Sequence, residues 1–108
     1  MKTNLTKAAL PAARQRLLEL MQTMNFGRIE DLAVRGGNPV FDPPPRVIRE
    51  LKIGGDNGPR PERDASDFLL KDQVVELFFH LDRLGDGTVA IIEVKHGLPF
   101  RLLLTESV

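Results

Sequence analysis

The stretch TVAIIEVKHGLPFRLLL, residues 88–104, predicts an antiparallel hairpin and thereby the class of the fold. Its apolar residues alternate on both sides of Lys95-His96-Gly97, which we interpret as a three-residue loop with glycine in the left-handed position. This register gives one purely apolar face with three facing pairs: Val94 with Leu98, Ile92 with Phe100, and Ala90 with Leu102. The other face is half apolar and holds Ile91, Glu93, Arg101 and Leu103. We therefore expect a hairpin that is central in the sheet or covered on its back by another subunit.

A second hairpin is predicted by RIEDLAVRGGNPVF, residues 28–41. Gly36-Gly37 form a two-residue turn between alternating apolar positions, which are Leu32 and Val34 before it and Pro39 and Phe41 after it. Ile29 is out of phase with Leu32, which predicts a bulge near Glu30-Asp31.

Three prolines, residues 43–45, follow this hairpin directly in FDPPPRVIREL. Each fixes φ and removes a backbone donor, so they are excluded from a central strand. A new strand is predicted from Arg46, with Val47, Leu51 and Ile53 on its buried face. We interpret the prolines as a stiff corner between two strands rather than as a ligand for a proline-binding domain, because such a ligand has to be accessible.

Two amphipathic helices complete the pattern. The first begins at Pro11 and ends at Asn25-Phe26-Gly27, after a loose tail at about residues 1–8, and its apolar face holds Leu10, Ala13, Leu17, Leu20, Met21 and Met24. The second begins at Asp64 or Ser66 and runs to Leu84, and it has two apolar sectors: Leu70, Val74, Leu77, Leu81 and Leu84, and then Phe68, Val75, Phe78 and Phe79. So wide an apolar arc predicts that this helix is covered from more than one side.

The predicted order α-β-β-β-α-β-β indicates an α+β fold, with an antiparallel sheet of about five strands packed by two helices. The chain of 108 residues is long enough for one domain, residues 1–108. No internal repeat is evident in the sequence. The absence of cysteine excludes disulfides and thiolate chemistry. The chain also lacks a signal-like apolar segment and any run of roughly 20 apolar residues, which favours a cytoplasmic protein.

The formal net charge is zero but unevenly distributed. Residues 1–28 hold five basic residues against one acidic residue, and residues 64–94 hold seven acidic against two basic. The favoured interpretation is that the two regions lie close together and cancel. The alternative is a basic face for nucleic acid.

Catalytic, cofactor and metal chemistry find little support in the sequence. His80 and His96 lie far apart and lack companion ligands at the usual spacing. The glycine-rich segment GGDNG, residues 54–58, lacks the ligand pattern of a calcium loop and the lysine of a phosphate loop. The carboxylates Glu30, Asp31 and Asp42 are expected to be solvated at a surface turn. We expect no catalytic residue, cofactor or metal site.

Four arginines carry the alternative of a nucleic-acid-binding or regulatory module: Arg46, Arg49, Arg60 and Arg63. Arg49 shares the parity of Val47 and Leu51, so we expect it to form an ion pair with an acidic residue of the second helix. The chain has neither Trp nor Tyr, which single-strand binders use as stacking platforms. A weaker alternative is a small-ligand or enzymatic site near the 54–64 loop.

The favoured hypothesis is a non-catalytic protein-interaction or self-assembly module, in the first place a homodimer. It rests on an excess of apolar side chains beyond what one core needs. The candidate dimer or partner surface consists of Phe68, Val75, Phe79, Ile91 and Leu103.

Residues 25–62, which run from NFGRIE to NGPRPE, resemble a family of short uncharacterised bacterial proteins. The resemblance covers about a third of the chain, and its most specific parts are DPPPR, residues 42–46, and NGPRPE, residues 57–62. It implies no activity, cofactor, partner or binding residue.

Overall fold

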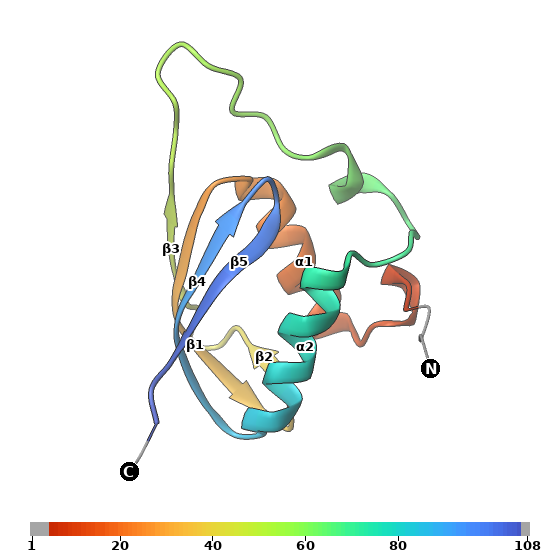
Figure 1. Cartoon of the computed structure of the whole chain (residues 1–108), viewed down its shortest axis with the longest axis vertical. Coiled ribbons are helices and arrows are strands. Elements are labelled where there is room, and N and C mark those ends of the chain that lie inside the picture. The colour runs from red at the N-terminus through yellow and green to blue at the C-terminus, as the bar shows by residue number, and fades with distance from the viewer. Residues whose placement is uncertain (1–4, 107–108) are drawn as a thin grey trace.

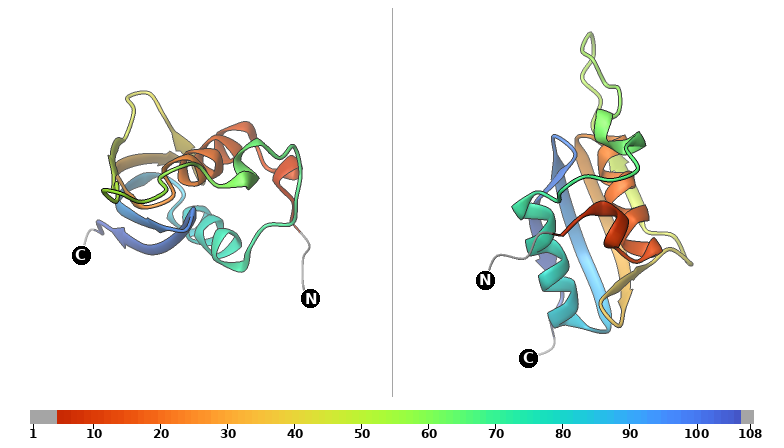
Figure 2. Two further views of the ribbon diagram at one scale, coloured as in Figure 1. Left: turned by 90° about the horizontal axis from the view of Figure 1, so that it is seen from above. Right: turned by 90° about the vertical axis from the view of Figure 1, so that its right-hand side faces the viewer.

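Five strands form one antiparallel sheet, and two helices cover the same face of it (Figures 1 and 2). The structure is a computed structural model that describes residues 5–106. The elements in chain order are η1 (Lys7–Ala9), α1 (Ala12–Met24), β1 (Gly27–Arg35), β2 (Asn38–Val40), β3 (Arg46–Arg49), η2 (Pro61–Asp64), α2 (Asp72–Leu84), β4 (Gly87–Lys95) and β5 (Leu98–Leu104). The α+β class and the order of helices and strands predicted from the sequence are confirmed.

The chain contains a structural repeat that the sequence does not reveal. Residues 11–40 and 71–100 have identical secondary structure at an offset of sixty residues, each with a helix, a long strand, a two-residue turn and the start of a return strand. Only five of these thirty positions are identical, namely Leu17/Leu77, Gly27/Gly87, Val34/Val94, Gly37/Gly97 and Pro39/Pro99. The expectation that there is no internal repeat is therefore wrong at the level of structure.

The two halves meet at their long strands. Gly27 pairs with Val94, and Val34 pairs with Gly87 in the antiparallel ladder of β1 and β4. Gly87 is the equivalent of Gly27 in the second half, and Val34 is the equivalent of Val94 in the first half. Each pair therefore maps onto the other when the two halves are exchanged, which means that a local two-fold axis passes between the two strands. The buried core follows the same equivalence, with six pairs from the two halves: Leu17/Leu77, Leu18/Phe78, Met21/Leu81, Ile29/Val89, Leu32/Ile92 and Val34/Val94.

The axis also marks the place where the alternation of side chains breaks. Ile29 and Leu32 are both fully buried although they are three residues apart, and Val89 and Ile92 repeat this spacing in β4. Asp31, between the first two, has a φ of 58°. The alternation therefore breaks where the bulge was predicted, but β1 and β4 keep the same register on both sides of Asp31, so no extra residue is inserted into the ladder.

The triple proline has a different role from the one predicted. β2 and β3 both pair with β1, with Val34 opposite Pro39 and Ile29 opposite Val47. They are therefore two pieces of one interrupted edge strand, and the pairing register changes by three residues between them. Residues 41–45 leave the ladder because prolines supply no donor to it. The prolines are an insertion within a strand position rather than a corner between neighbouring strands.

Three further boundaries differ from the sequence prediction. The second hairpin pairs Lys95 with Leu98, so its loop is His96-Gly97 alone, with φ values of 53° and 72°. Both residues are left-handed, as a two-residue hairpin turn of type I′ requires. The second helix begins at Asp72, because residues 61–64 form a separate 3₁₀ turn. β3 ends at Arg49, and the side chains expected to be buried beyond it are exposed, Leu51 by 54% and Ile53 by 97%.

The N-terminal segment is fixed from residue 5 onward rather than loose, whereas the part of the predicted tail before residue 5 lies outside the described residues. Thr6 bridges Leu69, and the Leu70 N–H donates to the Leu5 carbonyl over 2.9 Å. Lys7 is 4% exposed, and its ammonium donates to three acceptors: the Ala65 carbonyl (2.8 Å), the Arg63 carbonyl (3.1 Å) and Glu19 Oε2 (3.3 Å). These bonds satisfy all three N–H groups of the lysine, which accounts for its burial.

Candidate functional site

The sheet has two edges of opposite character. The strand order β2-β1-β4-β5, with β3 also on β1, places β5 alone at one edge. β5 runs as one strand over LPFRLLL and carries one proline, Pro99, and one charge, Arg101. The opposite edge is broken by residues 41–45 and carries prolines at 39 and 43–45. Proteins protect exposed edges with prolines, charges and breaks, and the β5 edge has less of this protection than the opposite edge.

The β5 edge exposes large apolar side chains. Phe100 is 56% exposed and Leu103 is 38% exposed. Phe100 has no partner in the ladder of β4 and β5, because the register shifts between Glu93 opposite Arg101 and Val94 opposite Pro99. The Lys95 ammonium lies 4.1 Å from the centre of the Phe100 ring. An exposed aromatic residue on an edge strand is typical of an interaction surface.

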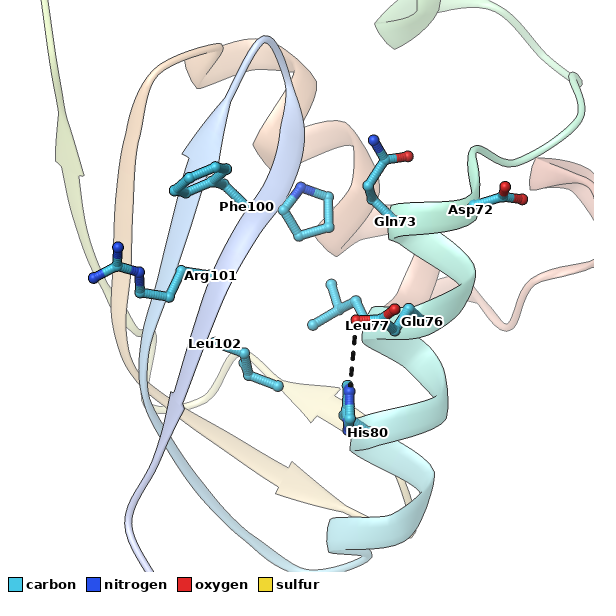
Figure 3. Close-up of a pocket in the computed structure, with 9 residues that line it drawn as sticks. Asp72, Gln73, Glu76, Leu77, His80, Phe100, Arg101 and Leu102 are labelled. Atoms are coloured by element: carbon cyan, nitrogen blue, oxygen red, sulfur yellow. Dashed lines mark ion pairs between the residues drawn. The ribbon is translucent and has the colours of Figure 1, made fainter.

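A groove runs between β5 and α2 (Figure 3). Its volume is about 190 Å³. One wall is polar and comes from the first turns of α2, where Asp72 and Glu76 precede His80, whose Nε2 lies 3.8 Å from Glu76 Oε2. The other wall is residues 99–102 of β5. The groove therefore lies beside the unpaired backbone of the edge strand and can accommodate side chains of a strand added there.

The face of the sheet opposite the helices carries an ion-pair row. Arg28 Nε lies 2.7 Å from Glu30 Oε2, and Arg46 Nε donates to Glu30 Oε1 over 2.9 Å. The hydrogen bonds from Arg46 and then Arg28 lower the pKa of the Glu30 carboxyl, and burial opposes this effect. Next to this row, Ile91 and Leu103 are direct cross-strand partners.

The five residues of the predicted dimer surface do not form one patch. Ile91 and Leu103 pair on the sheet, whereas Val75 and Phe79 lie on α2. Phe79 is 54% exposed and does not line the groove beside β5. Phe68 precedes α2 and packs against the core, with the Lys7 ammonium 5.7 Å from its ring centre.

The four candidate arginines are engaged within the chain. Arg46 is paired with Glu30, Arg63 Nη2 lies 3.0 Å from Asp64 Oδ2, and Arg60 Nε lies 3.8 Å from Glu62 Oε2. Arg49 donates to the Asn57 carbonyl, so its predicted ion pair with the second helix is wrong. Because β3 ends at Arg49 on the edge of the sheet, the guanidinium group of Arg49 reaches the following loop instead. Carboxylate partners neutralise most of the charge that a polyanion would need.

The favoured interpretation of the charge distribution was that the basic N-terminal region and the acidic region 64–94 lie close together, and one ion pair joins them. Arg14 of the basic N-terminal region pairs with Asp82 of the acidic region.

The loop after β3 projects beyond the end of the sheet and is closed by its own hydrogen bonds (Figure 1). The Lys52 N–H donates to Asn57 Oδ1 over 2.9 Å, and Asn57 Nδ2 donates to the Lys52 carbonyl over 3.0 Å. Among residues 5–106 no group of three or more His, Asp or Glu side chains is placed to hold a metal ion. Within the same range, no helix has the length and apolarity needed to cross a bilayer.

The edge position of β5 was not predicted, because the hairpin was expected to be central or to be covered on its back by another subunit. The available indication was a difference in proline content, with one proline in residues 98–104 and four in residues 39–45. Comparison with family models, with curated proteins and with solved structures finds no match to this chain.

Proposed function

We propose that this chain is a self-assembly protein whose β5 strand pairs with the β5 strand of a second copy. The observation that carries the proposal is the contrast between the two sheet edges, one interrupted and holding four prolines, the other a single strand whose residues 100–104 are apolar except for Arg101. Such an edge offers a row of backbone donors and acceptors to another strand. Two identical edges related by a two-fold axis form the simplest such pair.

A two-fold axis through Leu102 gives the most favourable antiparallel register. It places Phe100 opposite Leu104 and Arg101 opposite Leu103. An axis through Arg101 would set two like charges directly opposite each other, which is destabilising. The groove between α2 and β5 has space for the side chains of the added strand.

Size-exclusion chromatography with light scattering tests the proposal. We expect twice the chain mass for the natural protein and the chain mass for the double variant Phe100→Lys/Leu103→Lys. Val47→Lys is the matched control, because Val47 is 42% exposed on the other edge, and it should leave the dimer intact. A monomeric natural protein at high micromolar concentration contradicts the proposal. So does a dimer that survives the double variant but is lost in Phe79→Glu.

Cysteine cross-linking tests the register. The chain has no cysteine, so Leu102→Cys introduces a single thiol. Facing residues of an antiparallel pair have Cα atoms about 4.5–5.5 Å apart, which is within the range of a disulfide. We expect a cross-linked dimer for Leu102→Cys and none for Phe100→Cys, whose two copies would be offset by four residues along the strand, roughly 13 Å. The reverse result rules out this register.

A further inference from the structure

A small cavity lies between α1, the turn of the second hairpin and the segment that leads into α2. Its volume is about 70 Å³. Its apolar lining comes from Leu18, Phe68, Leu69, Val74 and Leu98, and its other lining residues are Gln22, Arg60, Glu62, Lys71, His96 and Gly97. One water molecule needs about 15 Å³ of such space, so the cavity can hold roughly five non-hydrogen atoms.

Two buried oxygen atoms of this cavity accept no hydrogen bond from residues 5–106. Gln22 is 4% exposed, and one of these atoms is its Oε1. The other is Glu62 Oε2, whose side chain is 46% exposed as a whole and whose ion-pair partner Arg60 has its Nε 3.8 Å away. A buried acceptor without a hydrogen bond destabilises the folded chain, because it has lost its water and gained no donor. The cavity therefore favours a group that donates hydrogen bonds.

The structural repeat shows which group fills the equivalent place in the other half. There, the side chain of Arg14 on α1 donates to Asn38 Oδ1 (3.0 Å), to the Gly37 carbonyl (2.9 Å) and to Asp82. The equivalent positions in the second half, at an offset of sixty residues, are Val74 for Arg14, Gly97 for Gly37, Leu98 for Asn38 and Gln22 for Asp82. All four of these residues line the cavity.

We infer that the cavity is a binding site for a guanidinium group, which would stand where Arg14 stands in the other half. The Val74 side chain has no hydrogen-bond donor, and Arg60, which also lines the cavity, donates no hydrogen bond to Gln22 Oε1 or Glu62 Oε2. A guanidinium ion has four non-hydrogen atoms, which fit the cavity, and it is a pure donor, as Gln22 Oε1 and Glu62 Oε2 require. The Glu62 carboxylate supplies the opposing charge.

The remaining charged groups lie at the mouth of the cavity. Lys71 is exposed, and the Arg60 side chain is 41% exposed. The His96 ring packs edge-on against Phe26, with 4.7 Å between ring centres. The mouth is therefore cationic, which favours a ligand that carries an anionic group beyond its guanidinium group, as free arginine does.

Nuclear magnetic resonance titration of the full chain tests the inference independently of the oligomeric state. Methylguanidinium should give saturable shifts at the Gln22 side-chain amide, Val74 and Gly97. Tetramethylammonium has the charge but no N–H donor and should give none. Free arginine and N-acetylarginine amide are then compared. Tighter binding of free arginine indicates a small-molecule ligand, and tighter binding of N-acetylarginine amide indicates an arginine side chain of a peptide. Equal shifts with tetramethylammonium, or no saturable shift with any guanidinium compound, would overturn the inference.

Two variants complete the test. Gln22→Leu removes the buried amide and should weaken methylguanidinium binding at least tenfold while the protein remains folded. Val74→Arg with Gln22→Asp copies the Arg14 and Asp82 arrangement into the second half and should abolish binding by filling the cavity. Unchanged binding in Gln22→Leu would place the ligand elsewhere and contradict the assignment, whether or not the double variant folds.

Discussion

Gly37 and Gly97 make the same hydrogen bond on opposite sides of the local two-fold axis. The Gly37 N–H donates to the Gly85 carbonyl over 2.9 Å, and the Gly97 N–H donates to the Asn25 carbonyl over the same distance. Gly85 and Asn25 are the C-cap residues of α2 and α1. Each hairpin turn is thus tied to the helix end of the other half, and the two halves are locked together reciprocally.

The first prediction concerns these turns. An alanine at Gly37 would have a φ of 78° and a Cβ 2.6 Å from Asp82 Oδ1, so both strain and a steric clash oppose it. Gly36 is also left-handed, but nothing lies within 4 Å of its Cβ position. We expect Gly36→Ala to cost about 1 kcal/mol of unfolding free energy and Gly37→Ala about 2–3 kcal/mol, by urea denaturation. Equal costs would show that the contact with α2 contributes nothing.

The second prediction compares Gly27 with its equivalent, Gly87. A Cβ on Gly27 would lie 2.1 Å from the Ile48 carbonyl oxygen, and the φ is 148°. A Cβ on Gly87 would lie 3.0 Å from Leu84 Cδ1, which is the end of a mobile side chain. We expect Gly27→Ala to lose at least about 3 kcal/mol, with loss of protection of the β3 amides from hydrogen exchange, and Gly87→Ala to lose less than about 1 kcal/mol. Intact β3 protection in Gly27→Ala would contradict this.

The third prediction concerns the buried Lys7. Lys7→Met keeps the length of the side chain but leaves the Ala65 and Arg63 carbonyls without their donor. We expect a loss of about 2 kcal/mol and faster cleavage by trypsin within residues 60–71. Lys95→Met is the control, because Lys95 is exposed. The prediction fails if both variants unfold at the same urea concentration and are cleaved at the same rate.

The fourth prediction is a pH dependence from Glu30. Its pKa in the folded chain is lowered from the ordinary value of 4.5 by the hydrogen bonds from Arg46 and Arg28. A lowered pKa means that the ion pairs contribute fully to stability above pH 4.5 and that this contribution is lost as the pH falls through the lowered pKa. Glu30→Gln should therefore flatten the fall in stability below pH 4.5. A carboxyl titration that gives Glu30 an unshifted or raised pKa would disprove the arrangement.

The sequence predicts the fold class because its turns and periodicities are local properties. Gly36-Gly37 fixes one hairpin, and the apolar spacing from Leu17 to Met24 fixes one helix. The boundary of α2 fails because residues 65–70 are ordered by Lys7 and Leu5, which are distant in sequence. The predicted hairpin register is wrong by one residue at the turn, because His96 adopts a left-handed conformation that favours glycine. It is wrong by two residues where Ile92 pairs with Leu102 instead of Phe100, because the ladder shifts again between Glu93 and Val94.

The candidate sites were harder to predict than the fold. The edge position of β5 depends on the order of all five strands, which no local pattern contains. The cavity depends on Val74 standing where its equivalent is Arg14, and this comparison requires the repeat to be known. Generic leucine, isoleucine and valine positions conceal the repeat, since any core accepts them in either half.

The proline interruption of the β2 edge has a consequence for how far assembly can grow. If both halves of the repeat offered an open edge, each copy would join two neighbours and the sheet could extend into a fibre. Because residues 41–45 break one edge, the proposed pairing uses only the β5 edge of each chain. Under that proposal both β5 edges are occupied in the dimer, so assembly would stop at two chains. The prolines at one edge of the sheet would thus limit the size of an assembly that forms through the other edge.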